Sequence, residues 1–225
     1  MLMARLRPAA AVSFDMDGVL LDTERLYTEA TQQIVGRFGK VFDWRVKGEM
    51  IGRPALDSAR HLVDALSLPI TAEDYLRERE LHFEALMPTA EPMPGARELV
   101  AALAARGVPQ AVATSSSTRL FEMKTRRHRD WFATFTVIVR GDDPRCVRGK
   151  PAPDIFLVAA ADLGVAPDAC VVIEDAPAGL AAARAAGMTV IAVPDPGMDR
   201  ARFAGADLIV GSLAELDPDQ LLGAR

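Results

Sequence analysis

The sequence predicts an α/β fold in which a doubly wound parallel sheet is interrupted, after its first strand, by an all-helical block. From residue 95 onward, short continuous apolar segments alternate with helical ones, which is typical of parallel strands covered by helices on both faces. Between residues 22 and 94, apolar residues instead recur at spacings of three and four, and no strand pattern is evident. The length of 225 residues fits this plan, since it exceeds the roughly 150 residues of one typical domain by enough for an insert.

The first part of the chain contains one strand and three helices. A short apolar strand covers residues 11–14 and ends at an acidic turn. Three amphipathic helices follow, with apolar faces formed within residues 26–38, 56–66 and 75–86. The three prolines between residues 88 and 94 indicate a linker or hinge.

The chain after this linker alternates between helices and strands. The predicted elements are a helix over 96–106, a strand over 109–114, a helix over 118–129, a strand over 135–139, a helix over 154–163, a strand over 170–173, a helix over 178–186, and strands over 189–193 and 206–210. We therefore expect an α/β core formed by residues 1–22 and 95–225, and a helical domain formed by residues 23–94.

Composition narrows the class of protein. The chain carries 26 Lys and Arg against 31 Asp and Glu, so its formal charge of −5 argues against a nucleic-acid binder. The two cysteines, Cys146 and Cys170, form no disulfide framework or zinc pattern, which favours a reducing cytoplasm. No run of about 18 apolar residues indicates a membrane span, and a secretory signal is poorly supported. We expect a cytoplasmic protein, by default a monomer, with no nucleic-acid or membrane partner.

Polar side chains gather at the carboxyl ends of the predicted strands, where sites form in open α/β sheets. Asp15 and Asp17 follow the first strand, Thr114 follows the second, and Glu174-Asp175 follows a later one. Lys150 lies just ahead of a helix. Two carboxylates spaced i and i+2 can have different catalytic roles, the first as nucleophile and the second as general acid and base.

Attack of a carboxylate on phosphorus requires that cations offset the repulsion from the phosphate dianion. The ammonium of Lys150 and a divalent cation meet this need, and oxygen-only ligands favour Mg²⁺ over zinc. The hydroxyl of Thr114 and nearby backbone N–H groups could hold the remaining phosphate oxygens. Each segment alone also fits a structural role, as a turn, a calcium loop, a helix cap or an exposed lysine. Their occurrence together, in order, favours an active site.

These segments resemble the four motifs of the haloacid dehalogenase (HAD) superfamily, and the resemblance covers essentially the whole chain. The matching segments are Asp15-Met16-Asp17-Gly18-Val19-Leu20-Leu21-Asp22-Thr23-Glu24, Ala113-Thr114-Ser115, Gly149-Lys150-Pro151-Ala152-Pro153-Asp154 and Ile173-Glu174-Asp175-Ala176-Pro177-Ala178-Gly179. The resemblance implies a Rossmann-like core with an inserted all-helical cap domain. It also implies phosphoryl transfer through an aspartyl-phosphate on Asp15, with Asp17 protonating the leaving group and then activating water.

The resemblance also implies which residues bind substrate and metal. Thr114 and Lys150 would bind the phosphoryl group, Mg²⁺ would be the cofactor, and Asp17 would reach the metal through its backbone carbonyl. Gly52 and Arg53 occupy a loop that related caps turn toward the substrate. The candidate residues are, as catalytic groups, Asp15, Asp17, Thr114 and Lys150; as substrate-binding groups, Ser115, Ser116, Gly52 and Arg53; and as metal ligands, Asp15, Asp17, Glu174 and Asp175.

A second set of segments is similar to the group of pseudouridine-5'-phosphatases and plant glycerol-3-phosphatases. These segments lie at residues 22–27, 93–96, 123–128, 140–144 and 187–195. The similarity implies a small phosphate monoester as substrate, of the pseudouridine 5'-phosphate, glycerol 3-phosphate or sugar phosphate type. The basic run that begins at Lys124 is interpreted as a solvated helix face.

Two alternatives stay open. A phosphosugar mutase related to β-phosphoglucomutase shares all four motifs, but such mutases carry a histidine in the first cap helix where this chain has Tyr27. A non-enzymatic binding protein on the same fold would not need the intact set of acidic and basic residues. His61, His82 and His128 are too scattered to indicate a zinc site.

Overall fold

The computed structural model describes residues 7–51 and 55–223 and divides into two compact units. The first unit contains residues 1–22 and 91–225, and the second contains residues 23–90. The predicted fold class is confirmed, because the first unit is built around a parallel sheet and the second is helical. The domain assignment made from the sequence, with the cap ending at residue 94, stays a prediction.

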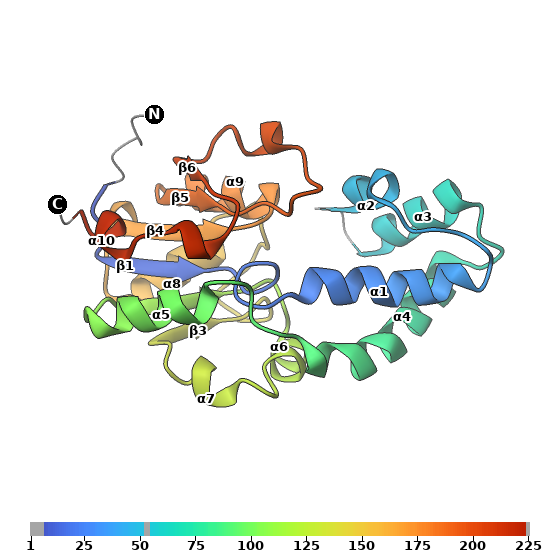
Figure 1. Cartoon of the computed structure of the whole chain (residues 1–225), viewed down its shortest axis with the longest axis horizontal. Coiled ribbons are helices and arrows are strands. Elements are labelled where there is room, and N and C mark those ends of the chain that lie inside the picture. Colours follow the sequence, from blue (N-terminus) through green and yellow to red (C-terminus); the bar gives the residue numbers. More distant parts are fainter. Residues whose placement is uncertain (1–6, 52–54, 224–225) are drawn as a thin grey trace. The chain divides into compact units, whose positions relative to one another are not determined.

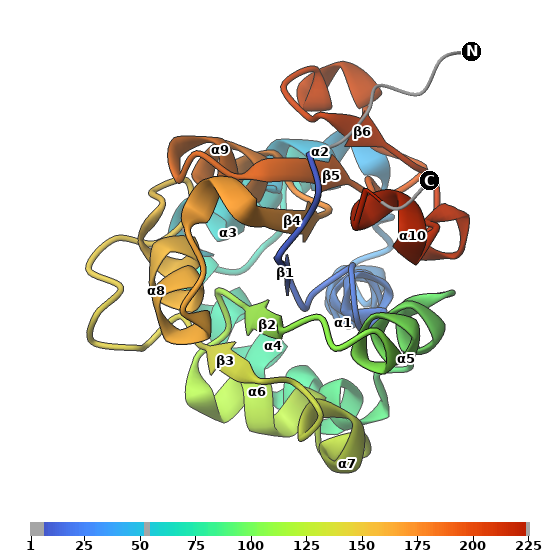
Figure 2. The ribbon, with the colours of Figure 1, turned by 90° about the vertical axis from the view of Figure 1, so that its left-hand side faces the viewer.

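The sheet of the first unit has six strands in the order β3-β2-β1-β4-β5-β6, and every neighbouring pair is parallel. Its strands are β1 (Ala11–Phe14), β2 (Gln110–Ala113), β3 (Val137–Val139), β4 (Cys170–Glu174), β5 (Thr189–Ala192) and β6 (Leu208–Ile209). Figure 1 labels all of them except β2, which is labelled in Figure 2. Every residue of β1, β2, β4 and β5 is buried, which explains why these strands appear in the sequence as predominantly apolar runs. The strand order reverses direction between β1 and β4, and this is the point where doubly wound sheets bind ligands.

Helices cover both faces of this sheet. In Figure 2, α8 and α9 lie on one face, and α5 and α10 lie on the other. The helices of this unit are α5 (Ala96–Ala105), α6 (Thr118–Lys124), α7 (Arg129–Phe132), α8 (Asp154–Leu163), α9 (Pro177–Ala185) and α10 (Pro218–Leu221), with short 3₁₀ helices η2 (Pro167–Ala169), η3 (Arg200–Phe203) and η4 (Leu213–Glu215). These helices bury the apolar side chains on both faces of the parallel sheet.

One predicted helix, over residues 118–129, is divided in the structure. Helix α6 ends at Lys124, and α7 begins at Arg129. The interpretation of this run as a solvated face is wrong for Lys124, whose side chain is 0% exposed. The physical reason is helical spacing, since Phe121, Lys124 and Thr125 share one buried face at i, i+3 and i+4.

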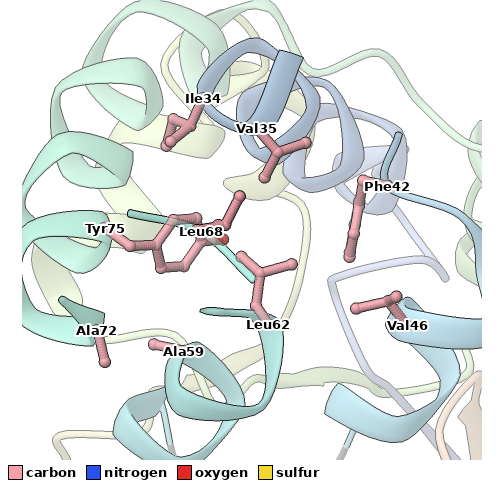
Figure 3. Packing of buried hydrophobic residues seen from close by; sticks show 9 residues of the cluster. All are labelled: Ile34, Val35, Phe42, Val46, Ala59, Leu62, Leu68, Ala72 and Tyr75. Atoms are coloured by element: carbon pink, nitrogen blue, oxygen red, sulfur yellow. The ribbon is translucent and has the colours of Figure 1, made fainter. Parts of the chain in front are cut away.

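The second unit packs four helices around its own apolar core. These helices are α1 (Thr23–Gly36), α2 (Trp44–Met50), α3 (Ala55–Leu66) and α4 (Ala72–Leu86), followed by the 3₁₀ helix η1 (Met87–Thr89). Figure 3 shows the core residues, which are Ile34, Val35, Phe42, Val46, Ala59, Leu62, Leu68, Ala72 and Tyr75. The sequence did not predict α2, because it is only seven residues long and its start depends on the side chain of Asp43, which caps the N–H groups of Arg45 and Val46.

No helix in the part of the chain that the structure describes is long and apolar enough to cross a membrane.

Candidate active site

The predicted site residues of the first unit converge at one edge of its sheet. Asp15 follows β1, Thr114 follows β2, and Asp175 follows β4. Strand β1 pairs with β2 on one side and with β4 on the other, so the carboxyl ends of the three strands lie next to one another. The structure therefore places at one edge residues that lie more than 150 positions apart in the sequence.

Lys150 is the centre of a buried ion-pair cluster. Its Nζ donates hydrogen bonds to Asp15 Oδ1 at 2.5 Å, to Glu174 Oε1 at 2.7 Å and to the carbonyl oxygen of Ala113 at 3.1 Å. The side chain of Lys150 is 7% exposed, and Nζ also lies 4.9 Å from the centre of the Phe156 ring. All three ammonium protons have acceptors, which is the condition under which a buried lysine can remain charged.

The environment of this cluster changes the pKa of both members of the Asp15 pair. Burial raises the pKa of Asp15 from 3.8 to about 7; Lys150 opposes this rise, while Glu174 and Asp17 add to it. Burial by itself lowers the pKa of Lys150, but the charges of Asp15 and Glu174 outweigh burial and raise it above its usual value. Because one ammonium is shared by two carboxylates, Lys150 stays charged. The ionised form of Asp15 keeps a net free-energy cost of burial that Lys150 does not fully offset. A bound cation would reduce that penalty.

Both oxygens of Glu174 accept hydrogen bonds within the protein. Oε1 accepts from Lys150, and Oε2 accepts from the backbone N–H groups of Asp175 and Ala176, each at 3.0 Å. The carboxylate is therefore tied to the start of α9 while it holds Lys150. This arrangement favours Glu174 as an anchor for Lys150, and its role as a direct metal ligand stays a prediction.

The carboxylate of Asp17 has different partners from that of Asp15. Its Oδ1 accepts from Lys124 Nζ at 2.5 Å, and its Oδ2 accepts from Ser116 Oγ at 3.0 Å. Ser116 Oγ in turn accepts from Lys124 at 2.8 Å. Sequence reasoning did not find Lys124 as a site residue. Two signals were present, namely its position on the apolar face of α6 and its being one of only four lysines in the chain.

The loop that follows β2 is held by the loop that follows β3. Thr114 is fully buried, and its hydroxyl oxygen accepts the N–H of Ser116 at 3.1 Å. The carbonyl of Ser116 accepts the N–H of Gly141 at 2.9 Å, and Asp142 accepts hydrogen bonds from the backbone and hydroxyl of Thr118. Ser115 lies exposed at the turn between these contacts. The structure thus places Thr114, Ser115 and Ser116 in one fixed loop beside Asp17.

The remaining two candidates, Gly52 and Arg53, lie outside the described residues. Their assignment to substrate binding stays a prediction.

The candidate donors at the sheet edge have the chemistry that Mg²⁺ prefers. They are the carboxylates of Asp15 and Asp175 and the backbone carbonyl of Asp17, so all are oxygens. Asp175 Oδ2 lies only 2.2 Å from the position that a Cβ on Gly18 would take, so this carboxylate reaches the backbone next to Asp17. Among residues 7–51 and 55–223, no three acidic, histidine or cysteine side chains form a metal cage.

Gly18→Ala is expected to lower kcat/KM on the order of 10²-fold, because its methyl group would displace the carboxylate of Asp175. Gly18 also has a φ of +77°, which disfavours alanine by itself. Gly107→Ala is the matched control, since Gly107 has a φ of +70° and no atom within 4 Å of an added Cβ. Steady-state kinetics of both variants should show the loss only in Gly18→Ala. Equal losses would mean that backbone strain, and not displacement of Asp175, is responsible.

The fold and this site together define a class of protein, a Rossmann-like hydrolase with a helical insertion after its first strand. The family model of the haloacid dehalogenase-like hydrolases matches residues 9–187, and the chain belongs to this family. The resemblance stated from the four motifs is confirmed, and the chain is an enzyme of the phosphatase type.

Several relatives cover nearly the whole chain. The protein named (DL)-glycerol-3-phosphatase 2 of Arabidopsis thaliana is 46% identical over 214 residues, which are 93% of this chain and 89% of the relative. A protein of Drosophila melanogaster named probable pseudouridine-5'-phosphatase is 44% identical over 218 residues, covering 96% of this chain and 94% of the relative. The crystal structure of a HAD family hydrolase from Deinococcus radiodurans, with bound phosphate and sodium, superposes with a TM-score of 0.78 at 31% identity over 92% of this chain and 93% of that one.

Proposed function

We propose that this chain is a Mg²⁺-dependent phosphatase that hydrolyses a small phosphate monoester through an aspartyl-phosphate on Asp15. The observation that carries this proposal is the contrast between the two carboxylates that follow β1. The carboxylate of Asp15 is 9% exposed and lies against the ammonium of Lys150, whereas that of Asp17 is 21% exposed and is held by a hydroxyl and a second ammonium. Two carboxylates in such different surroundings are suited to different roles.

The proposed reaction has two steps on the same pair of aspartates. First, a carboxylate oxygen of Asp15 attacks phosphorus, the bond to the ester oxygen breaks, and protonated Asp17 gives its proton to the departing oxygen. Next, the carboxylate of Asp17 takes a proton from a water molecule, whose oxygen attacks the same phosphorus. The bond to Asp15 then breaks and phosphate leaves. Both aspartates return to their starting protonation states.

Cationic and hydrogen-bonding groups would stabilise the phosphoryl group during both steps. The ammonium of Lys150 lies beside the carboxylate of Asp15, and the loop from Thr114 to Ser116 would supply the hydroxyl of Thr114 and a backbone N–H. Mg²⁺, when bound by Asp15, Asp175 and the carbonyl of Asp17, would supply charge neutralisation between the phosphate and Asp15.

The substrate class follows from the relatives. The names of those relatives specify glycerol 3-phosphate and pseudouridine 5'-phosphate, and small sugar phosphates are of the same chemical type. Arg53 stays the candidate for contact with the part of the substrate distal to its phosphate.

A screen of phosphorylated metabolites tests this function. We expect the purified protein to release inorganic phosphate from at least one of glycerol 3-phosphate, pseudouridine 5'-phosphate and small sugar phosphates, with EDTA abolishing release and added Mg²⁺ restoring it. The mutase alternative predicts isomerisation of β-glucose 1-phosphate without net release of phosphate. That result would overturn the proposal, whereas Tyr27, in place of the histidine of related mutases, supports it.

The compartment and the assembly state are further proposals. Cys146 and Cys170 are both free thiols, which supports the cytoplasm as the compartment, to be tested by fractionation of the host cell. We also propose a monomer, to be tested by sedimentation.

A further inference from the structure

The ammonium of Lys124 and the hydroxyl of Ser116 hold both oxygens of the Asp17 carboxylate. Lys124 Nζ contacts Oδ1, Ser116 Oγ contacts Oδ2, and Lys124 also donates to Ser116. The three side chains therefore form a closed triangle of hydrogen bonds. Because each carboxylate oxygen has its own donor, the triangle fixes the rotation of the Asp17 carboxyl group.

The position of Lys124 is energetically unusual. Its side chain is 0% exposed, although it belongs to a residue type that is almost never fully buried unless it is paired. A buried ammonium requires compensation by an opposite charge and by acceptors for its protons; Asp17 provides the charge, and Asp17 and Ser116 accept two of the protons. The lysine is the last residue of α6, so this helix and the loop after β2 determine the position of its ammonium beside Asp17.

We propose that Lys124 is a positioning residue that aims the carboxyl group of Asp17 at the ester oxygen and at the attacking water. This inference rests on the proposed function, in which Asp17 exchanges protons at those two oxygens. Lys124 need not touch the substrate. Its effect would be limited to the proton transfers of Asp17, while attack by Asp15 and the charge supplied by Lys150 would persist without it.

This role makes a prediction about leaving groups. An alkyl phosphate releases an alkoxide, which needs the proton of Asp17, whereas 4-nitrophenyl phosphate releases a phenolate that departs without one. Since kcat/KM includes the steps through transfer to Asp15, Lys124→Met should reduce kcat/KM for glycerol 3-phosphate, or another alkyl phosphate that the wild type hydrolyses, by about 10²-fold or more. The value for 4-nitrophenyl phosphate should remain near that of the wild type.

The same role predicts which intermediate accumulates. Hydrolysis of the aspartyl-phosphate needs Asp17 to take a proton from water, so this step should become slow in Lys124→Met. During turnover of 4-nitrophenyl phosphate, acid-quenched Lys124→Met should therefore carry more phosphate on Asp15 than quenched wild type, as measured by mass spectrometry. Asp17→Asn should show the same leaving-group pattern, and adding Lys124→Met to it should cause no further loss.

Matched variants separate positioning from charge and from folding. Arg126→Met removes one positive charge at an exposed position two residues away, and it should leave both kcat/KM values unchanged. Lys124→Gln keeps hydrogen-bond donors and should recover part of the alkyl phosphate activity. Ser116→Ala removes the other donor to Asp17 and should show a weaker form of the same pattern, which tests the triangle even if Lys124→Met does not fold.

The outcomes distinguish this inference from the function on which it rests. Equal losses for alkyl and aryl phosphates in Lys124→Met and Ser116→Ala, or losses that add to that of Asp17→Asn, would overturn the positioning role. Absence of phosphate release by the wild type, or absence of phosphate on Asp15, would overturn the proposed function itself.

Discussion

Asp15→Asn is expected to abolish phosphate release, with a loss on the order of 10⁴-fold or more, because the amide has no oxygen able to form an acyl phosphate. The loss should be the same for alkyl and aryl phosphates, since both require transfer to Asp15. Steady-state phosphate release and mass spectrometry of the quenched protein would measure it, and no phosphate should be found at this position.

The folded state should survive this substitution. Burial raises the pKa of Asp15 to about 7, so an ionised carboxylate at this position is costly to the fold above that pH and a neutral amide is not. Lys150 retains Glu174 as its partner in the variant. We therefore expect a midpoint of thermal unfolding no lower than that of the wild type at pH 8 in metal-free buffer. Unchanged turnover in a folded Asp15→Asn protein would refute the assigned nucleophile.

Gly179→Ala is expected to damage both stability and activity, because a Cβ at this position would lie 1.7 Å from Glu174 Oε1. The carboxylate of Glu174 would have to move away from Lys150 and from the N–H groups at the start of α9. Breaking a buried ion pair of this kind costs about 3–5 kcal/mol. Lys150 would then lose the anchor that holds it beside Asp15, so turnover should fall together with the midpoint of thermal unfolding.

A second helical glycine provides the control for Gly179→Ala. Gly48 lies within α2 and has no atom within 4 Å of an added Cβ. Alanine at that position should leave turnover unchanged and stabilise the protein by about 0.5–1 kcal/mol, since alanine favours helix over glycine. If Gly179→Ala behaved like Gly48→Ala, the close packing of Glu174 against α9 would not matter to the enzyme.

The inner strands β1, β2, β4 and β5 could be predicted because every residue in them is buried. Strands β1 and β4 appear in the sequence as mostly apolar runs, and acidic residues mark where both end. Helix α8 has the bounds predicted from the sequence, where Pro153 marks its start, and the structure shows that Gly164 ends it in the left-handed conformation. Helix α2, by contrast, was missed, since a helix of seven residues has too little periodicity to recognise.

The surroundings of the candidate site were only partly predictable. The roles of Asp15 and Asp17 followed from their spacing and from the family resemblance, and both stay proposals until tested. The buried state of Lys124 was not predicted, because a basic residue in a basic run is usually solvated. The engagement of both oxygens of Glu174 was not predicted either, since it depends on how closely β4 approaches α9 at Gly179.

The sequence by itself determined the order of elements and the edge at which the acidic residues meet. Parallel strands have a fixed direction, so any residue that follows a strand is placed at the same edge. Only the tertiary structure decided which ammonium pairs with which carboxylate, because the partners come from distant parts of the chain. Lys150 and Asp15 are 135 positions apart, and Lys124 and Asp17 are 107 positions apart. Such pairs are set by where the tertiary structure places α6 and the loop before α8, which no local pattern in the sequence records.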